Sequence, residues 1–371
     1  DFDMIVVGAG IVGMSTALWA QKEGLKTLIC DPNPAGSGAT YGSACTVATY
    51  ACIPVNSPSI FASLPQLLTS RDSPLSFNFG YGLKNPRWML SFLNNCRPSR
   101  VKHISQALGQ FLTYSDGGLD PLIAEARAQD LIVSNDCLYV WSSRAGYESA
   151  ADGNAMRTAQ GVDFEELTSD EVRQLEPNLQ QPIHRGLRFK GARHITNPQE
   201  LVSRMQKRFE ALGGIHLTNS VATCEADDTG VTAQLCDGTE IRGGHLALTA
   251  GARSSQIKGT GAEKLPLGTE RGYHILYRDA GDLVSRPVGW AEAGFYATPM
   301  AHGLRIAGTV EINAIDAAFN INCTDYLARK STEMFGYLGT PDDTWLGHRP
   351  TMPDSLPVIG HSANSKRIIF A

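Results

Sequence analysis

Residues 4–13 read MIVVGAGIVG, an apolar run that leads directly into the glycine pattern GxGxxG. The next segment, 15–20 (STALWA), predicts a helix, and 26–30 (KTLIC) predicts a second strand that ends at Asp31. This order is typical of a βαβ unit that binds a dinucleotide: a strand, a glycine turn, a helix, a second strand and an acidic residue. The alternative is a glycine-rich turn in an ordinary parallel sheet.

The three glycines of the motif have separate expected roles. Gly8 permits the tight turn, Gly10 lets the backbone approach a pyrophosphate, and Gly13 lets the helix lie close to the strand. The helix N-terminus offers free N–H groups to the phosphates, and Asp31 is placed to accept hydrogen bonds from a ribose. NAD and FAD share this motif, so it leaves the dinucleotide open. The candidate cofactor-binding residues of the unit are Gly8, Gly10, Ile11, Val12, Gly13 and Asp31.

The composition is that of a globular chain. Its 371 residues are 42% hydrophobic, enough for two or three domains, and the formal net charge of −5 gives no reason to expect nucleic-acid binding. We recognise no signal peptide and no stretch of the roughly 18–20 apolar residues that span a bilayer. We therefore expect a cytoplasmic protein. Peripheral association with the cytoplasmic face of the inner membrane is the other location considered.

The cysteines are scattered, with no CxxC pair and no Cys/His cluster at metal-ligand spacing. Free structural thiols in a reducing compartment are expected, and no metal site. The cysteines are residues 30, 45, 52, 96, 137, 224, 236 and 323.

Later segments interrupt the dinucleotide fold. A loop of small residues follows Asp31, and such a loop is either a flexible linker or a place where backbone passes close to a bulky ligand. Residues 57–150 read as largely helical. A helix that begins at Pro198 is followed by strands within 215–241, the pattern of a β-meander, and by an apolar strand that ends at Thr249-Ala250-Gly251. Further strands are predicted at 273–277, 294–299 and 304–308.

Four segments carry a resemblance to a known family. They are GAGIVG at 8–13, the loop 36–47, LTAGARS at 248–254 and GHRPTMPDSLPVIG at 347–360. With them the chain resembles the D-amino-acid oxidase superfamily of FAD-dependent oxidoreductases, and most closely its D-amino-acid dehydrogenase and glycine oxidase branches. ERGYH at 270–274 and the helix at 87–96 favour the dehydrogenase branch. Asp31 replaces the more common Glu, and Cys45 stands where the branch often has Gly.

The resemblance implies a fold and a domain order. We expect an α/β (α+β) protein with a Rossmann-like FAD-binding domain and an interleaved substrate domain built on an antiparallel sheet. FAD binding is assigned to 1–63, 167–262 and 346–371, and the substrate domain to 64–166 and 263–345. The run RIIFA at 367–371 reads as a core strand, and we expect the natural protein to continue beyond it, because the family continues into a glycine-rich turn and a helix.

The resemblance also implies FAD, bound non-covalently, rather than NAD. Val221 would present its backbone to the adenine. The pyrophosphate side and the isoalloxazine end would be approached by two backbone segments, so that replacing their side chains should have mild effects unless bulk is added. These segments are Thr249, Ala250 and Gly251 for the pyrophosphate, and Thr40, Tyr41, Gly42, Ser43 and Ala44 for the isoalloxazine.

The substrate carboxylate needs a planar cation that can bind it at two points. Arg349, in GHRP, matches the carboxylate-binding arginine of the family; a surface or salt-bridged arginine is the alternative. Tyr296 matches the active-site tyrosine of glycine oxidase, or it is a core residue. Tyr273 and His274 are neighbours on a strand, so only one of them faces the flavin unless a bulge intervenes. We favour His274, and a structural histidine bonded to backbone is the alternative.

The expected reaction is FAD-dependent oxidative deamination of a D-amino acid to the 2-oxo acid and ammonia. The hydride passes from Cα to flavin N5 and the electrons go on to a quinone or another acceptor. The competing readings are an oxidase that uses O₂ on glycine, sarcosine or a D-imino acid, an unrelated NAD-dependent dehydrogenase, and a non-catalytic flavin-bound redox subunit.

Overall fold

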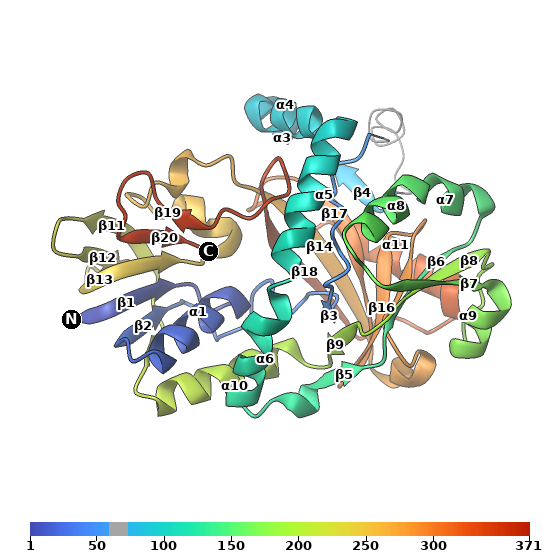
Figure 1. Ribbon diagram of the computed structural model, residues 1–371, viewed down its shortest axis with the longest axis horizontal. Coiled ribbons are helices and arrows are strands. Elements are labelled where there is room, and N and C mark those ends of the chain that lie inside the picture. The colour runs from blue at the N-terminus through green and yellow to red at the C-terminus, as the bar shows by residue number, and fades with distance from the viewer. Residues whose placement is uncertain (59–72) are drawn as a thin grey trace.

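The computed structural model of the chain describes residues 1–58 and 73–371. Two large sheets carry the fold. The sheet with the glycine motif lies on the left of Figure 1, and a longer sheet lies on the right. The first sheet is mixed and the second largely antiparallel, with helices around both, which confirms the predicted α/β (α+β) class. The expected domain boundary between residues 63 and 64 lies outside the described residues.

The sheet that contains the motif, the N-terminal sheet, has the strand order β10-β2-β1-β13-β12-β11; β20 pairs with β13, and β19 with β20. β1 runs parallel to both of its neighbours, so that Val7 lies beside Cys30 and Leu248. The strands are β1 (Phe2–Val7), β2 (Thr27–Cys30), β10 (Ile215–Leu217), β11 (Val221–Ala226), β12 (Val231–Leu235), β13 (Glu240–Leu248), β19 (Gly360–His361) and β20 (Ile368–Phe370).

The predicted meander is present as β11-β12-β13, and its last two predicted strands are one continuous strand. Gly243 and Gly244 lie in the middle of β13 without interrupting it. A Cβ at Gly243 would lie 2.9 Å from the Ile5 side chain, and one at Gly244 would lie 3.1 Å from the Asp3 carbonyl oxygen. The glycine pair therefore lets β1 approach β13 closely.

Three helices cover one face of the N-terminal sheet with a shared apolar core that includes Met14, Leu122 and Phe209. Local signals set the start of one of them: Asn197 accepts a hydrogen bond from the Glu200 backbone N–H, and a proline occupies the first helical position. The helices are α1 (Ile11–Lys22), α6 (Ser115–Glu125) and α10 (Pro198–Ala211).

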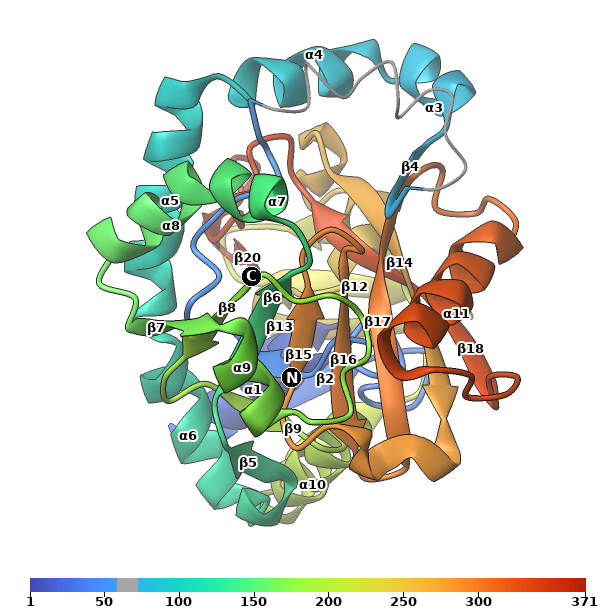
Figure 2. The same cartoon turned by 90° about the vertical axis from the view of Figure 1, so that its right-hand side faces the viewer.

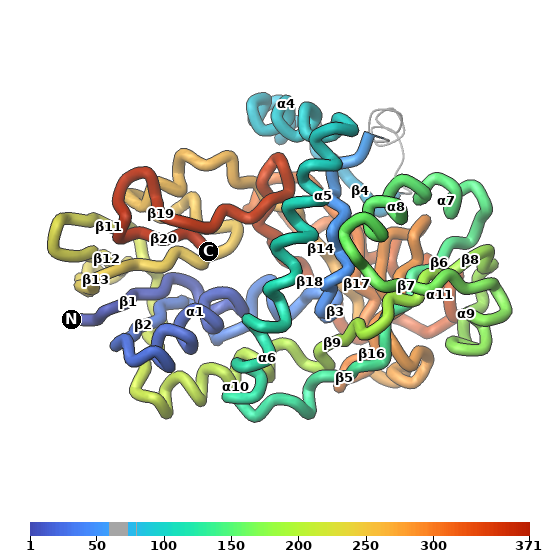
Figure 3. The backbone as a smooth tube through the Cα atoms, viewed as in Figure 1, coloured from blue at the N-terminus to red at the C-terminus, as the bar shows by residue number. Residues whose placement is uncertain are grey.

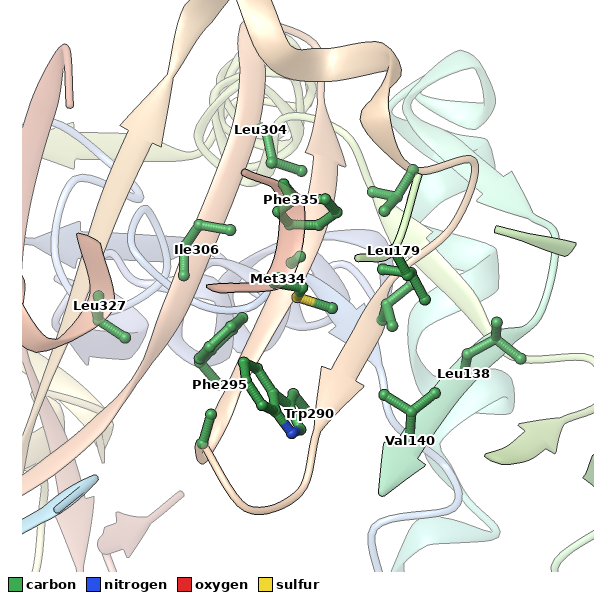
Figure 4. Close-up of a cluster of buried hydrophobic side chains, with 14 of the residues drawn as sticks. Leu138, Val140, Leu179, Trp290, Phe295, Leu304, Ile306, Leu327, Met334 and Phe335 are labelled. Atoms are coloured by element: carbon green, nitrogen blue, oxygen red, sulfur yellow. The ribbon is translucent and has the colours of Figure 1, made fainter. Parts of the chain in front are cut away.

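The second sheet has nine strands in the order β18-β14-β17-β16-β15-β6-β8-β7, with β4 beside β17. Helix α11 (Ile321–Phe335) packs on one face of it, as Figure 2 shows. Trp290, Phe295, Met334 and Phe335 meet in the core between them (Figure 4). The strands are β4 (Leu75–Phe77), β6 (Cys137–Trp141), β7 (Phe164–Thr168), β8 (Arg185–Phe189), β14 (Gly268–Tyr277), β15 (Val288–Trp290), β16 (Phe295–Met300), β17 (Gly303–Ile312) and β18 (Asp343–Thr351).

The remaining elements are a small third sheet and further helices. A small sheet joins three strands in the order β3-β9-β5: β3 (Thr46–Val47), β9 (Arg193–Ile195) and β5 (Ile132–Ser134). The other described α-helices are α3 (Phe79–Lys84), α4 (Pro86–Asn95), α5 (Pro98–Leu112), α7 (Arg144–Ser149), α8 (Ala151–Ala159) and α9 (Ser169–Leu175). Helix α9 begins with a cap at Thr168, which forms a capping box with Glu171.

The chain passes repeatedly between the two sheets, which is visible along the tube of Figure 3. Two expected domain boundaries do not follow the strand pairing. β8, expected in the cofactor-binding part, pairs with β6 and β7 in the nine-stranded sheet, and β18 pairs with β14 there. The expected boundary between residues 345 and 346 therefore cuts β18. The sequence contains no local signal for these long-range pairings.

No helix among the described residues is long and apolar enough to cross a membrane. All eight cysteines are free thiols, and all except Cys236 are buried.

Candidate active site

The glycine turn joins β1 tightly to α1. Gly8 has a φ of +102°, and a Cβ there would lie 2.6 Å from the Thr249 carbonyl oxygen. A Cβ at Gly13 would overlap the carbonyl oxygen of Gly8. Both positions therefore require glycine, one for the turn and one for the contact of helix with strand.

The first turn of α1 leaves backbone donors free. The Ile11 N–H donates to Thr40 Oγ1 at 3.0 Å, while the N–H groups of Gly10, Val12 and Gly13 have no acceptor among the described residues. Val12 is 49% exposed, so this helix end is open to a ligand. Free N–H groups at an open helix N-terminus form an anion site. These residues therefore fit the diphosphate of a dinucleotide.

Asp31 fastens the turn to the end of β2. Its two carboxylate oxygens accept the N–H groups of Ala9 and Asn33, each at 2.8 Å. Because a carboxylate oxygen can accept a second hydrogen bond, the predicted contact to a ribose remains compatible with this arrangement. That contact stays a prediction.

Thr249 makes a structural contact through its side chain, and its expected backbone contact with the pyrophosphate stays a prediction. Its buried hydroxyl lies 2.7 Å from the Val7 carbonyl oxygen and 3.0 Å from that of Gly8. Replacing this side chain would release the glycine turn. Ala250 and Gly251, with a φ of +57° at Gly251, continue the turn after β13.

Val221 begins β11, and its side chain is buried in the core of the N-terminal sheet. Its predicted contact with the adenine through the backbone stays a prediction.

Loop 40–45 reaches from the N-terminal sheet to three strands of the nine-stranded sheet. The loop carbonyls of Tyr41 and Ser43 accept hydrogen bonds from Arg305 Nη1, at 2.7 and 3.1 Å. The Ala44 carbonyl accepts a hydrogen bond from Thr298 at 3.0 Å. The Gly42 carbonyl lies 3.2 Å from His274 Nδ1. The loop is therefore fixed to the sheet face by side chains of β14, β16 and β17.

His274 and Tyr296 lie on that same face of the nine-stranded sheet. Both are cross-strand partners of Ala307 on β17, and partners in an antiparallel pair project their side chains to one side. Their strands lie on either side of β17 in the view of Figure 2.

Arg349 shares this face as well. It pairs with Glu270, which precedes His274 by four residues on β14 and so points to the same side. The guanidinium lies over Gly272, where a Cβ would come within 2.5 Å of Arg349 Nη2. The structure thus brings Arg349, His274 and Tyr296 to one face of the sheet, the face on which loop 40–45 lies.

Tyr273 points to the other face. Its hydroxyl donates to Glu311 Oε2 at 2.5 Å, and the same carboxylate pairs with Arg271 at 2.7 Å in the core. Because strand side chains alternate, His274 is the neighbour on the face that contacts loop 40–45, and its contact with the flavin stays a prediction. Tyr273 is therefore removed from the candidate substrate residues.

His274 is a neutral hydrogen-bonding group. Burial, and then the charge of Arg305, lower its pKa to about 3, against a raising effect of the Gly42 carbonyl. A neutral ring that donates from Nδ1 to Gly42 presents Nε2 as an acceptor, and this buried Nε2 has no hydrogen-bond partner among the described residues. The ring stacks on Trp345, with 5.2 Å between centroids.

A profile of the DAO family, described as FAD dependent oxidoreductase, matches residues 3–371. The chain belongs to the DAO family of FAD-dependent oxidoreductases. This confirms the resemblance read from the sequence, with FAD as the cofactor.

Named relatives lie on both sides of the oxidase and dehydrogenase division. A D-amino-acid oxidase of Bradyrhizobium diazoefficiens is 30% identical, over 99% of this chain and 89% of the relative. A D-amino acid dehydrogenase of Helicobacter pylori is 22% identical, over 100% of this chain and 89% of the relative. The glycine oxidase structure from Geobacillus kaustophilus shares the fold, with a TM-score of 0.73 at 16% identity, over 100% of this chain and 88% of that one.

In this DAO-family chain, Arg349 has a carboxyl group as its neighbour. Its side chain is accessible to solvent, yet burial lowers the pKa of its guanidinium. The negative charge of Glu270 has the smaller, opposite effect and raises this pKa. Burial raises the pKa of Glu270. The charge of Arg349 and a hydrogen bond with Thr351 lower it by less.

This pair predicts a pH-dependent affinity for carboxylates. Ionised Glu270 offsets the charge of Arg349, and protonated Glu270 does not. Trifluoroacetate, the anion of a strong acid that stays ionised over this range, should therefore bind about fivefold more tightly as the pH falls through the pKa of Glu270, which lies above the ordinary 4.5. His274 stays neutral over this range, because its pKa is about 3. Calorimetric titration at a series of pH values measures the effect.

In E270Q the affinity should be high at every pH. E240Q, on the exposed end of β13, is the control and should titrate like the parent. A parent protein whose trifluoroacetate affinity does not change above pH 4.5 would contradict the coupling.

The sequence analysis missed Arg305 and Glu270. Arg305 is 4% exposed, has no carboxylate within 4.0 Å among the described residues, and lies 5.3 Å from the Tyr41 ring centroid. A charged residue inside the otherwise apolar segment 304–308 was the available signal. Glu270 stood in the quoted segment ERGYH, but its proximity to Arg349 depends on the register of β14 and β18.

Proposed function

We propose that this protein catalyses the FAD-dependent oxidative deamination of a D-amino acid to the 2-oxo acid and ammonia. The observation that carries the proposal is the placement of Arg349 on one sheet face with His274 and Tyr296. When bound, FAD supplies the acceptor for the hydride that leaves Cα. Loss of the hydride and a proton gives an imine, which water hydrolyses.

Each side chain of the site has a proposed task. Arg349 holds the substrate carboxylate through two parallel N–H donors, and its orientation is supported by Gly272 beneath it. The phenol of Tyr296 assists as a neutral donor, because burial raises its pKa well above the ordinary value. His274 Nε2 accepts a hydrogen bond from the substrate amine.

The cofactor residues are proposed on the same grounds. The free N–H groups of Gly10, Val12 and Gly13 would bind the pyrophosphate, and Asp31 the ribose. Loop 40–45, fixed to the sheet by His274, Thr298 and Arg305, would line the isoalloxazine end. Because its carbonyls are bonded to the nine-stranded sheet, the loop would hold the cofactor residues at a fixed position relative to the substrate residues.

For the electron acceptor we propose a quinone or another carrier, in line with the segment ERGYH and the dehydrogenase relatives. The second candidate is an oxidase that uses O₂. It is favoured by the 30% identity with a protein named D-amino-acid oxidase over 99% of this chain.

Anaerobic reduction tests the function. The FAD-loaded protein is mixed with D-amino acids, their L-enantiomers, glycine and sarcosine, and flavin bleaching is followed. We expect D-amino acids to bleach the flavin at least about a hundredfold faster than L-enantiomers. The reduced protein is then mixed with O₂ or with a soluble quinone.

Fast reoxidation by the quinone supports the dehydrogenase, and fast peroxide formation identifies the oxidase instead. A flavin that no amine bleaches would contradict the proposed function. The remaining interpretation would then be a non-catalytic, flavin-bound redox subunit.

A further inference from the structure

Arg305 is a buried cation behind loop 40–45, which is proposed to line the isoalloxazine. It pairs on β17 with Leu276 of β14, two residues beyond His274, so its side chain lies on the sheet face that carries the loop. The residue is 4% exposed, and its Nη1 donates to two carbonyl groups of the loop at 2.7 and 3.1 Å. The charge is therefore fixed directly beneath the loop backbone.

The hydrogen-bond partners of Arg305 are all neutral, and they all lie at one nitrogen. Besides the two carbonyls, Nη1 lies 3.2 Å from Cys45 Sγ, and burial raises the pKa of this thiol, which keeps it uncharged. Nε is buried without a hydrogen-bond partner, and Nη2 makes no hydrogen bond among the described residues. No carboxylate lies within 4.0 Å of the guanidinium in the part of the chain that the structure describes. Arg305 is thus a buried charge without a counter-ion.

Other arginines of the nine-stranded sheet and its surroundings show the usual solution. Arg271 is fully buried and pairs with Glu311 at 2.7 Å, and Arg286 pairs with the buried Glu176 at 2.9 Å. Removing a guanidinium from water is costly unless an anion compensates its charge. At Arg305 the chain supplies carbonyl groups but no acid. This arrangement is expected where a bound group supplies the negative charge.

The charge of Arg305 acts across the candidate site. After burial, it is the second cause that lowers the pKa of His274, which contacts the same loop through the Gly42 carbonyl. A cation that disfavours a second positive charge nearby favours a negative charge there by the same interaction. Negative charge that develops next to loop 40–45 is therefore stabilised.

Reduction of the flavin produces such a charge. A hydride carries one proton and two electrons, so the neutral oxidised isoalloxazine becomes an anion when the hydride from Cα arrives at N5. The diphosphate of FAD has the same charge before and after this transfer. A cation beside the ring therefore stabilises the reduced form of the cofactor more than the oxidised form.

We propose that Arg305 raises the reduction potential of the bound FAD through the charge that it places behind loop 40–45. The inference rests on the proposed function for the position of the isoalloxazine at this loop. Arg305 acts through its charge and not as a substrate ligand. It sets how readily the flavin accepts the hydride and how readily it passes the electrons on.

The midpoint potential of the FAD-loaded protein tests the inference without any amino acid. It is measured during slow anaerobic reduction, in equilibrium with a dye of known potential. We expect the equilibrium constant for two-electron reduction to fall about tenfold or more in R305Q, which corresponds to a potential lower by about 30 mV. For a variant that loses FAD during purification, the dissociation constants of oxidised and photochemically reduced FAD give the same ratio.

Three variants separate the charge of Arg305 from its anchoring of the loop. R305K keeps a cation, and its equilibrium constant should stay within about threefold of the parent. T298V removes the hydrogen bond to the Ala44 carbonyl without removing a charge, and its potential should equal that of the parent. R144Q removes an exposed arginine from helix α7, where solvent and salt screen the charge, and should also leave the potential unchanged.

A parental potential in R305Q would overturn the proposal. Equal weakening of oxidised and reduced FAD would also overturn it, because Arg305 would then serve the diphosphate and not the isoalloxazine. An R305K potential as low as that of R305Q would show that hydrogen-bond geometry matters and the charge does not. The measurement is independent of turnover: a protein that oxidises no amine contradicts the proposed function and can still show the shift in R305Q.

Discussion

The largest loss of activity is expected for R349L, which should lower the second-order rate of flavin reduction by amino acids about a hundredfold or more. A hydrogen bond to a charged partner contributes about 1.5–3 kcal/mol, and the guanidinium offers two in one plane. Leucine removes both and also leaves Glu270 without its neighbouring cation. The measurement is anaerobic stopped-flow reduction over a range of substrate concentrations.

R349K should give an intermediate rate, because it retains the charge without the planar fork. R253Q is the matched control: Arg253 is an exposed arginine, and its loss should leave the rate within about threefold of the parent. FAD content should stay unchanged in all three variants, and the melting temperature should stay unchanged in R253Q. A parental rate in R349L would remove Arg349 from the site.

The second large effect is expected for G13A, which should fail to retain FAD. The added methyl would overlap the Gly8 carbonyl oxygen and lie 2.6 Å from Thr249 Oγ1, and neither group is free to move. Overpacking against fixed backbone costs about 3 kcal/mol or more. The helix must therefore withdraw from the turn, which displaces the N–H groups of Gly10 and Val12.

The measurements are the visible absorbance of the purified protein and the dissociation constant for FAD added to the apoprotein. We expect the affinity to fall about a hundredfold or more, which corresponds to about 3 kcal/mol. G38A is the control, because nothing lies within 4 Å of a Cβ there. Normal flavin content in G13A would show that the turn tolerates the methyl group.

The sequence was most informative where the determinants are local. The order of strand, glycines and helix in residues 2–30 predicted the βαβ unit, and Pro198 predicted the start of α10. Each of these features depends on residues a few positions apart, so a single stretch of sequence contains the whole signal.

The pairing of strands from distant segments could not be predicted from local sequence in the same way. Strand alternation showed that Tyr273 and His274 face opposite sides, but not which side carries the flavin, because that depends on where α11 packs. The same holds for β8 and β18, whose partners were assigned to another part of the chain. Glu270 and Arg305 emerge as candidates only once strands from distant segments are brought together.

The position of β1 between β2 and β13 has a consequence for biosynthesis. β2 follows β1 almost at once, whereas β13 begins only at Glu240. At about 5–20 residues per second, the first strand leaves the ribosome on the order of 10 to 50 seconds before its second partner exists. Throughout that interval one edge of a very apolar strand is unpaired and prone to aggregate. The yield of native protein should therefore depend on chaperone supply and on growth temperature more than on the final stability of the fold.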